Sequence, residues 1–347
     1  MSYLKDGPIR HLVAYGSDGL SYVTVPPRPP ADGELLISPG VSLVSPGTEL
    51  HYIRRAVESG ECFPLGYCSA GVVMEVGAGC GDFAVGDRVI AMGWGRAVHG
   101  TRIWVPFRLC VKIPPDVRVN DAVVANLAAT AVHAIDRSGM VAGDEVLVVG
   151  AGIVGSLVAQ VAAAFHATVT VVDSHPERVS LVSELGHPNI MGAMWETVAG
   201  GTMKTSARRH ALICLSGDAT VALRMATEWS CAGGGRPVVT AVGRFTALTE
   251  FNVDHGNIDY RISARCGEGY RDEAYELGLK DVTAPVGEAT VTRNLERALY
   301  LIKQGLICPG RMPIYSTRFD RASEAYELLR DEKAWITARL TYGTHDD

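Results

Sequence analysis

The pattern of apolar and polar positions changes about a third of the way along the chain. Before residue 119, short apolar or alternating runs are separated by clusters of proline and glycine, which predicts strands and turns rather than helices. The strands are expected at Leu35–Ser38, Ala70–Val76, Arg88–Met92 and Ile103–Pro106. Such spacing is typical of a compact, irregular β barrel.

After residue 119, helical and strand patterns alternate. An Ala-rich helix is expected from Asp121 to about Arg137, and further helices near 176–186 and 218–229. Strands are expected at Val146–Val149, Thr168–Val172, Ala211–Leu215, Pro237–Val242 and Ile262–Cys266. Because strands that alternate with helices form parallel sheets, this part predicts an α/β, doubly wound sheet with a ligand site at the carboxyl edge of its strands.

The last part of the chain is expected to return to the first domain. Residues 291–305 show helical apolar periodicity, and a strand at Met312–Thr317, a helix at 321–331 and a strand at Trp335–Leu340 follow. The predicted organisation is a split first domain, residues 1–119 and 290–347, around an inserted α/β domain, residues 120–289.

Three glycines stand at the start of the α/β domain, in G-x-G-x-x-G spacing between a predicted strand and a predicted helix. Gly150 permits a tight turn, Gly152 lets the backbone approach a pyrophosphate, and Gly155 lets the helix pack close to the sheet. The N–H groups of the first helical turn, with Ile153 and Val154, would face the phosphates. The pattern predicts a dinucleotide-binding βαβ unit. Its alternative is a glycine turn that serves packing alone.

Asp173 indicates which dinucleotide binds. It ends the second strand, 18 residues after Gly155, where a carboxylate accepts hydrogen bonds from ribose hydroxyls and repels a 2′-phosphate. NAD is therefore expected rather than NADP. Arg178 is the residue that argues for NADP, and we interpret it as a solvated helix residue. Ser216 and Val242, at the ends of later strands, are expected to line the cofactor cleft.

Composition narrows the classes of partner. The net charge of −6, with no basic tract, argues against nucleic acid. No run of 18 apolar residues occurs and the first ten residues lack the apolar core of a leader, so no membrane partner and a cytoplasmic location are expected. The eight cysteines lack C-x-x-C spacing and are expected to be free thiols.

Four motifs resemble the medium-chain dehydrogenase/reductase superfamily over nearly the whole chain: Ser45–His51 (SPGTELH), Pro64–Tyr67 (PLGY), Val85–Val89 (VGDRV) and Glu324–Leu329 (EAYELL). The resemblance implies a GroES-like, β-rich catalytic domain joined to a Rossmann domain. It also implies a homodimer or homotetramer formed through the edge of the Rossmann sheet. The SPGTE form looks like a subgroup acting on cyclitols or aminosugars.

The metal ligands of the zinc alcohol dehydrogenases in that superfamily are replaced here. The matching positions hold Pro46, Tyr67 and Asn126, and Cys68 stands where a glutamate belongs. The closely spaced cysteines of a structural zinc site are also missing after Val89. Since zinc requires a tetrahedral set of N and S ligands, we predict a zinc-independent member.

Catalysis without zinc requires another group to handle the alcohol proton. The resemblance places a hydroxyl at Thr48 and a proton-relaying imidazole at His51, and both side chains have suitable chemistry. Tyr67 is the candidate to replace the metal by hydrogen bonding to the reacting oxygen. The alternatives are that Thr48 caps a helix, that His51 is solvated and that Tyr67 is a core aromatic residue.

Substrate contacts are predicted for side chains near these motifs. They are Glu49, Trp94, His99, Glu268 and Tyr270, each with a structural alternative in helix-end solvation, loop packing or backbone contact.

The predicted function is an NAD-dependent, zinc-independent oxidation of a secondary alcohol to a ketone on a polar ring substrate, namely a cyclitol, sugar or aminosugar. The alternatives are a zinc-free quinone or enoyl reductase and a non-catalytic NAD-binding protein.

Overall fold

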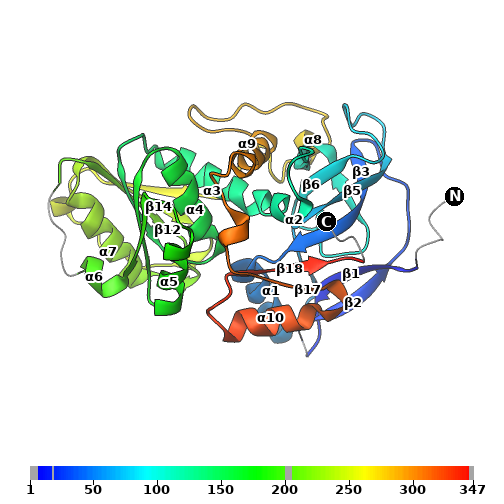
Figure 1. Cartoon of the computed structure of the whole chain (residues 1–347), viewed down its shortest axis with the longest axis horizontal. Coiled ribbons are helices and arrows are strands. Elements are labelled where there is room, and N and C mark those ends of the chain that lie inside the picture. Colours follow the sequence, from blue (N-terminus) through cyan, green and yellow to red (C-terminus); the bar gives the residue numbers. More distant parts are fainter. Residues whose placement is uncertain (1–6, 18, 200–204, 344–347) are drawn as a thin grey trace.

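The computed structural model describes residues 7–17, 19–199 and 205–343. Two bodies of sheet lie side by side (Figure 1). They are joined by a layer of helices that includes α2 (Val119–Ala122), α3 (Ala125–Ser138) and α9 (Val291–Lys303). The expectation that the chain lacks a leader rests partly on residues 1–6, which lie outside the described residues. No described helix has the length and apolarity needed to cross a membrane.

The α/β body contains a six-stranded sheet in the order β11-β10-β9-β12-β14-β16, and all neighbouring strands run parallel. This order reverses direction between β9 and β12, as in a Rossmann sheet, so the predicted doubly wound fold is confirmed. The strands are β9 (Glu145–Val149), β10 (Thr168–Asp173), β11 (Ile190–Met194), β12 (Arg208–Ile213), β14 (Gly234–Val242) and β16 (Asp259–Ser263).

Helices cover both faces of this sheet because successive strand residues point to opposite sides. On one face, Val146 and Val148 belong to the core that includes α3 and α4, whereas Leu147 and Val149 pack on the other face with α7. The helices of this body are α3 (Ala125–Ser138), α4 (Ile153–Ala164), α5 (Pro176–Glu184), α6 (Trp195–Ala199) and α7 (Thr220–Cys231). A short pair, β13 (Gly217–Asp218) and β15 (Phe245–Thr246), extends beyond the carboxyl ends of β12 and β14.

The second body has a seven-stranded mixed sheet that joins the two ends of the chain. Its path is β17-β18-β3-β5-β6-β8, with β7 pairing with β3, and β18 is antiparallel to β3. Its strands are β3 (Glu34–Leu43), β5 (Cys68–Val76), β6 (Arg88–Met92), β7 (Ile103–Pro106), β8 (Cys110–Lys112), β17 (Ile314–Arg318) and β18 (Thr337–Thr341). This mixed sheet fits a GroES-like domain.

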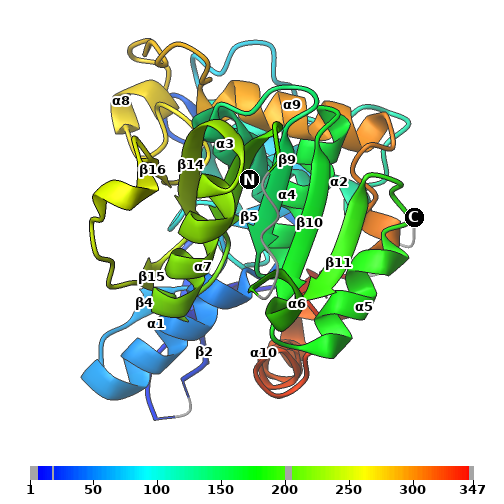
Figure 2. The same ribbon diagram turned by 90° about the vertical axis from the view of Figure 1, so that its left-hand side faces the viewer.

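Smaller elements complete this body. A three-stranded sheet holds β1 (Ile9–Ala14), β2 (Ser21–Val25) and β4 (Phe63–Pro64). The helices are α1 (Pro46–Ser59), α2 (Val119–Ala122), α8 (Glu273–Glu276), α9 (Val291–Lys303) and α10 (Ala322–Asp331). In the turned view, α5 lies beside β11 at one edge of the parallel sheet (Figure 2).

Several elements differ from the sequence expectation. The helix expected from Asp121 is divided into α2 and α3, and the strand expected at Ile262–Cys266 is β16, three residues earlier. β16 is the edge strand, and its residues Asp259, Tyr260 and Arg261 are only partly buried. Its mixed polar and apolar composition therefore hides it from a search for apolar runs.

Candidate functional site

The glycine loop between β9 and α4 has the close packing that its spacing predicts. A Cβ on Gly155 would lie 1.8 Å from the carbonyl oxygen of Gly150, so no larger residue fits there. Gly150 has φ +104°, and its Cβ would lie 2.6 Å from the carbonyl oxygen of Cys214. The loop thus brings the amino end of α4 against the sheet and leaves its first N–H groups, with Ile153 and Val154, available to an anion.

Asp173 is held at the carboxyl end of β10 by two backbone groups. Its Oδ2 accepts a hydrogen bond from the Ala151 N–H at 2.8 Å, and its Oδ1 accepts one from the His175 N–H at 3.0 Å. Each carboxylate oxygen keeps further lone pairs for a ribose hydroxyl. The carboxylate is therefore fixed beside the glycine loop, where the sequence analysis expected it.

Arg178 takes a different place from the solvated one that we expected. A Cβ on Gly152 would lie 3.2 Å from Arg178 Nη1, which puts the guanidinium over the glycine loop. Its Nε is buried and has no hydrogen-bond partner among the described residues. A guanidinium over the glycine loop, with an unused donor, is suited to an anionic phosphate at this edge of the sheet.

The other predicted cofactor contacts lie along the same sheet edge. Ser216 is exposed just after β12, and Val242 is buried as the last residue of β14. Both therefore stand at carboxyl ends of parallel strands, where ligands of such sheets bind.

Helix α1 carries two of the predicted catalytic residues. It starts at Pro46, with Ser45 in extended conformation as the N-cap residue, which corrects the alternative that Thr48 caps the helix. Proline is favoured in the first helical turn because its missing N–H would have no helical partner there. Thr48 and His51 therefore lie one turn apart on the same helix face.

Tyr67 contacts a residue that the sequence analysis did not single out. Its hydroxyl donates to Ser45 Oγ at 2.7 Å. Burial is the largest cause that raises the pKa of Tyr67 well above its ordinary value, and hydrogen bonds with Ser45 and Thr48 only partly oppose it. The phenol thus stays protonated at neutral pH, with its proton directed to Ser45 and its lone pairs left for another donor. A serine before a helix-starting proline was the available signal for Ser45.

An aromatic cluster surrounds Tyr67. The Trp94 ring lies 4.4 Å from the Tyr52 ring and 6.2 Å from the Tyr67 ring, between centroids. The Trp94 N–H donates to the Tyr270 hydroxyl at 3.0 Å. The structure therefore brings together Thr48, Tyr67, Trp94 and Tyr270, and adds Tyr52, whose role no sequence pattern indicated.

His51 lies at the contact between the two bodies. Arg244, which follows β14, donates from Nη1 to His51 Nε2 at 3.1 Å. The pKa of His51 is lowered from its ordinary value, first by burial and then by the positive charges of Arg244, Arg54 and Arg55. His51 is therefore a neutral imidazole at neutral pH, and it can accept a proton at Nε2 when the hydrogen bond from Arg244 opens.

Glu49 and His99 are both completely buried, which does not fit the direct substrate contact that the sequence suggested. Glu49 Oε1 accepts the Ser45 N–H at 2.6 Å, and its Oε2 lies 2.9 Å from His99 Nε2 and accepts the Tyr326 hydroxyl at 2.5 Å. His99 Nδ1 is 2.6 Å from Ser42 Oγ. This buried network ties the start of α1 to α10 and to β3.

Glu268 and Asn126, two further positions that the sequence analysis considered, lie away from the aromatic cluster or are engaged by backbone groups. Glu268 is exposed, and its backbone forms an isolated bridge with Thr290 rather than joining the aromatic cluster. Asn126 is buried, and its amide donates to the carbonyl oxygens of Ser69 and Val123. Within the described residues, no group of three or more His, Cys, Asp or Glu side chains is placed to hold a metal ion.

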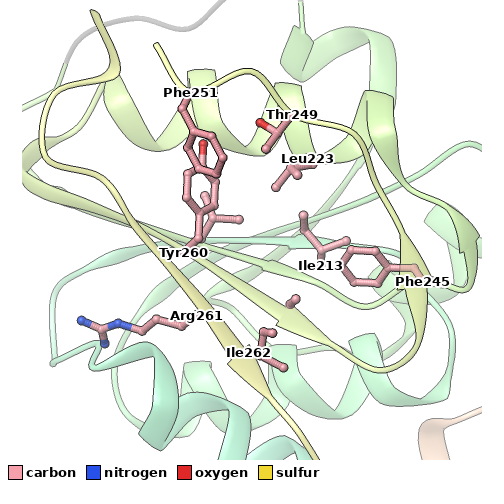
Figure 3. A pocket seen from close by; sticks show the side chains of 10 residues that line it. Ile213, Leu223, Phe245, Thr249, Phe251, Tyr260, Arg261 and Ile262 are labelled. Carbon is pink, nitrogen blue, oxygen red and sulfur yellow. The ribbon is translucent and has the colours of Figure 1, made fainter. Parts of the chain in front are cut away.

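A separate apolar pocket of ≈ 240 Å³ lies on the α7 face of the parallel sheet (Figure 3). None of the predicted site residues lines it; its walls are Ile213, Leu223, Val239, Ala241, Phe245, Thr249, Phe251, Tyr260, Arg261 and Ile262. It is therefore distinct from the cluster around Tyr67.

Comparison with known families and proteins places these features in context. Residues 127–212 match the family "Alanine dehydrogenase/PNT, C-terminal domain". The reducing polyketide synthase FUB1 of Gibberella fujikuroi is 31% identical over 255 residues, which are 70% of this chain and 10% of that protein. The (R,R)-butanediol dehydrogenase of Bacillus subtilis is 29% identical over 146 residues, 35% of this chain and 42% of that protein.

Solved structures share the whole fold. The 2R,3R-butanediol dehydrogenase of Bacillus subtilis has a TM-score of 0.74 and 18% identity, and the match covers 96% of this chain and 100% of that one. Acetophenone reductase from Geotrichum candidum, in complex with NAD, has a TM-score of 0.72 and 17% identity, with 97% and 98% covered. At these identities the likeness shows the fold.

Proposed function

We propose that the chain is an NAD-dependent oxidoreductase acting on CH–OH groups. The premise is that it is a member of the medium-chain dehydrogenase/reductase superfamily, which its fold and homologues support. More specifically, we propose that the protein oxidises a secondary alcohol to a ketone on a polar ring substrate, without zinc. Two of the relatives, (R,R)-butanediol dehydrogenase and sorbitol dehydrogenase, are named for alcohols, and one neighbouring structure holds NAD.

One contact carries the proposal. Arg244, at the carboxyl end of β14, touches His51 on α1, so the cluster around Tyr67 adjoins the sheet edge that carries the glycine loop. A dinucleotide bound across that edge and a substrate beside Tyr67 would then be neighbours. Groups that suit a nucleotide and groups that handle a proton thus meet where the two bodies touch.

These residues have separate roles in the proposed reaction. NAD, when bound, supplies the hydride acceptor. Tyr67, whose proton is engaged by Ser45, offers lone pairs to the substrate hydroxyl and orients it, and Thr48 contacts the same oxygen. His51, neutral and partly exposed, exchanges the released proton with solvent. Trp94 and Tyr270 form the aromatic wall against which a ring substrate packs.

Zinc independence is part of the proposal. A proline ring offers no donor atom at position 46, and the Tyr67 hydroxyl is engaged by Ser45. Asn126 offers a neutral amide: its Nδ2 donates to two backbone carbonyls, and its buried Oδ1 has no hydrogen-bond partner among the described residues. These residues do not fit a catalytic zinc ion. Metal analysis of the purified protein tests this, and stoichiometric zinc would contradict it.

The activity is tested by following reduced nicotinamide absorbance with NAD and a panel of cyclitols, sugars, sugar acids and aminosugars. NAD reduction by metal-free protein with any of these supports the proposal. Silence on the whole panel, with NAD still bound, would favour a non-catalytic NAD-binding protein.

Replacing Arg178 by alanine should weaken NAD binding about tenfold, since a charge-assisted hydrogen bond over the glycine loop is lost. Titration calorimetry with NAD measures this directly. Arg293→Ala is the matched control, because Arg293 is an exposed arginine on α9 paired with Glu296. Equal NAD affinity in the Arg178 variant and the wild type would remove Arg178 from the cofactor site.

Replacing His51 by glutamine should lower turnover roughly tenfold and remove the acidic limb of the pH profile. The neutral imidazole accepts the proton, so wild-type turnover falls only as pH drops through the pKa of His51, which burial and the neighbouring arginines hold below its ordinary value. The control is His187→Gln, in the loop before β11. An unchanged acidic limb in the His51 variant would exclude the relay.

A second candidate function is supported by the relationship to FUB1. A reducing polyketide synthase is 31% identical over 255 residues, so reduction of a carbon–carbon double bond is the alternative chemistry. The same preparation, tested with reduced nicotinamide cofactors and enoyl or quinone substrates, separates the two. Turnover confined to these substrates would replace the alcohol proposal.

We also propose that copies of the chain associate through the edge of the parallel sheet. Strand β16 has no further neighbour in its sheet, and Ile262 on it is 69% exposed. Sedimentation analysis measures the assembly.

A cytoplasmic location is proposed because all eight cysteines are free thiols.

A further inference from the structure

Arg244 occupies a fixed position at the opening between the two bodies. It lies between β14 and β15, and β15 is paired with β13, so its backbone is anchored on both sides. Its guanidinium donates to His51 at 3.1 Å and its central carbon lies 5.6 Å from the centre of the Tyr52 ring. Both partners belong to α1, so the Arg244 side chain connects the end of the parallel sheet with this helix.

The guanidinium has no carboxylate partner among the ion pairs found in the described part of the chain. Positive charge predominates around its partner His51: Arg54 and Arg55 on α1 lower the pKa of His51, and the opposing effect of the Glu58 carboxylate is smaller. Arg55 is engaged by Glu61. The balance of charge at this opening is therefore positive, in a protein whose net charge is −6.

The position of Arg244 separates it from the phosphate-binding loop. Strands β10 and β14 are separated in the sheet by β9 and β12, which places their ends about 14 Å apart at ordinary strand spacing. Arg178 follows β10 and covers the glycine loop, whereas Arg244 follows β14 and touches His51 and Tyr52. The two arginines therefore serve opposite ends of the ligand-binding edge.

We propose that Arg244 binds an anionic group of the substrate, a carboxylate or a phosphate monoester, and so selects sugar acids or sugar phosphates over neutral polyols and cationic aminosugars. The inference rests on the proposed function and narrows its substrate class. One N–H of the guanidinium contacts His51, and the remaining donors are free to hold two anionic oxygens. Contact with the Tyr52 ring keeps the guanidinium plane oriented.

The test compares matched neutral and anionic substrates, sorbitol with gluconate and galactitol with galactonate, in NAD reduction. Wild-type kcat/KM should favour the anionic member by at least about tenfold, and Arg244→Ala should remove that preference. The quantity compared is the ratio of anionic to neutral kcat/KM at one pH, because any effect of the substitution on His51 changes both members alike. Arg244→Lys should retain part of the preference, since lysine keeps the charge without the planar fork. Arg224→Ala, an exposed arginine on α7, is the matched control and should change nothing.

A binding measurement keeps the test decisive if no substrate turns over. Gluconate and inorganic phosphate are titrated against tryptophan fluorescence, because Trp94 packs on Tyr52 beside the guanidinium. Lost anion binding in Arg244→Ala alone supports the site even if the dehydrogenase proposal fails. Equal anion affinity in both proteins, or equal loss on neutral and anionic substrates, overturns it. Weaker NAD binding in the variant would instead assign Arg244 to a cofactor phosphate and also overturn it.

Discussion

Replacing Tyr67 by phenylalanine is expected to lower turnover at least about a hundredfold while leaving NAD affinity unchanged. The substitution removes the one hydroxyl that Ser45 holds at 2.7 Å and that faces the reacting oxygen in the proposed site. In the proposed site, NAD binds to the glycine loop, Asp173 and Arg178, which lie in the other body. Steady-state kinetics on the identified substrate and NAD titration give the two quantities.

The control for this prediction is Tyr300→Phe, because Tyr300 is 60% exposed on α9 and loses the same atom. A thermal melt shows whether either variant is destabilised. Turnover within twofold of wild type in the Tyr67 variant would make Tyr67 a packing residue and leave Thr48 as the group that contacts the reacting oxygen.

The second large effect is expected from Glu49→Ala, on stability rather than chemistry. Glu49 is completely buried and accepts from the Ser45 N–H and the Tyr326 hydroxyl while pairing with His99. Its removal leaves these groups buried without their acceptor, which costs about 3–5 kcal/mol of unfolding free energy. Denaturant unfolding followed by circular dichroism measures the loss.

Glu61→Ala provides the comparison for this loss. Glu61 pairs with Arg55 at 3.0 Å near the end of the same helix, but its side chain is 54% exposed, so its removal should cost less than about 1 kcal/mol. If the two variants lost similar stability, the buried network would not be what fixes α1. Because Ser45 is fixed through this network, Glu49→Ala should also disturb Tyr67, and a matching fall in turnover at temperatures where the variant is folded would show it.

Much of the fold follows from local pattern. The strands Arg88–Met92 and Ile103–Pro106 were predicted with the bounds that the structure shows, because each is an apolar run stopped on both sides by turn residues. The glycine spacing predicted the strand, loop and helix around Gly155. Only glycine fits at this position, because a Cβ on Gly155 would lie 1.8 Å from the carbonyl oxygen of Gly150. Edge strand β16 was misplaced because an exposed strand needs no apolar run.

For the candidate site too, some features could be predicted from the sequence and others could not. By itself, the sequence predicted the glycine loop and Asp173 after its strand from local spacing, and it predicted the roles of Thr48 and His51 only through the resemblance to a family. The glycine loop depends on neighbours within a few residues, so periodicity and spacing are sufficient to find it.

Only the tertiary structure decided which side chains meet across long separations. Ser45 meets Tyr67 across 22 positions, Glu49 meets His99 across 50, and Arg244 meets His51 across 193. Local patterns also do not show that Glu49 is completely buried. Nor do they show the order of strands in the sheet, which places Arg178 and Arg244 at opposite ends of one edge. These features arise because hydrophobic burial fixes how distant elements pack, and the polar side chains carried by those elements then pair where packing brings them together.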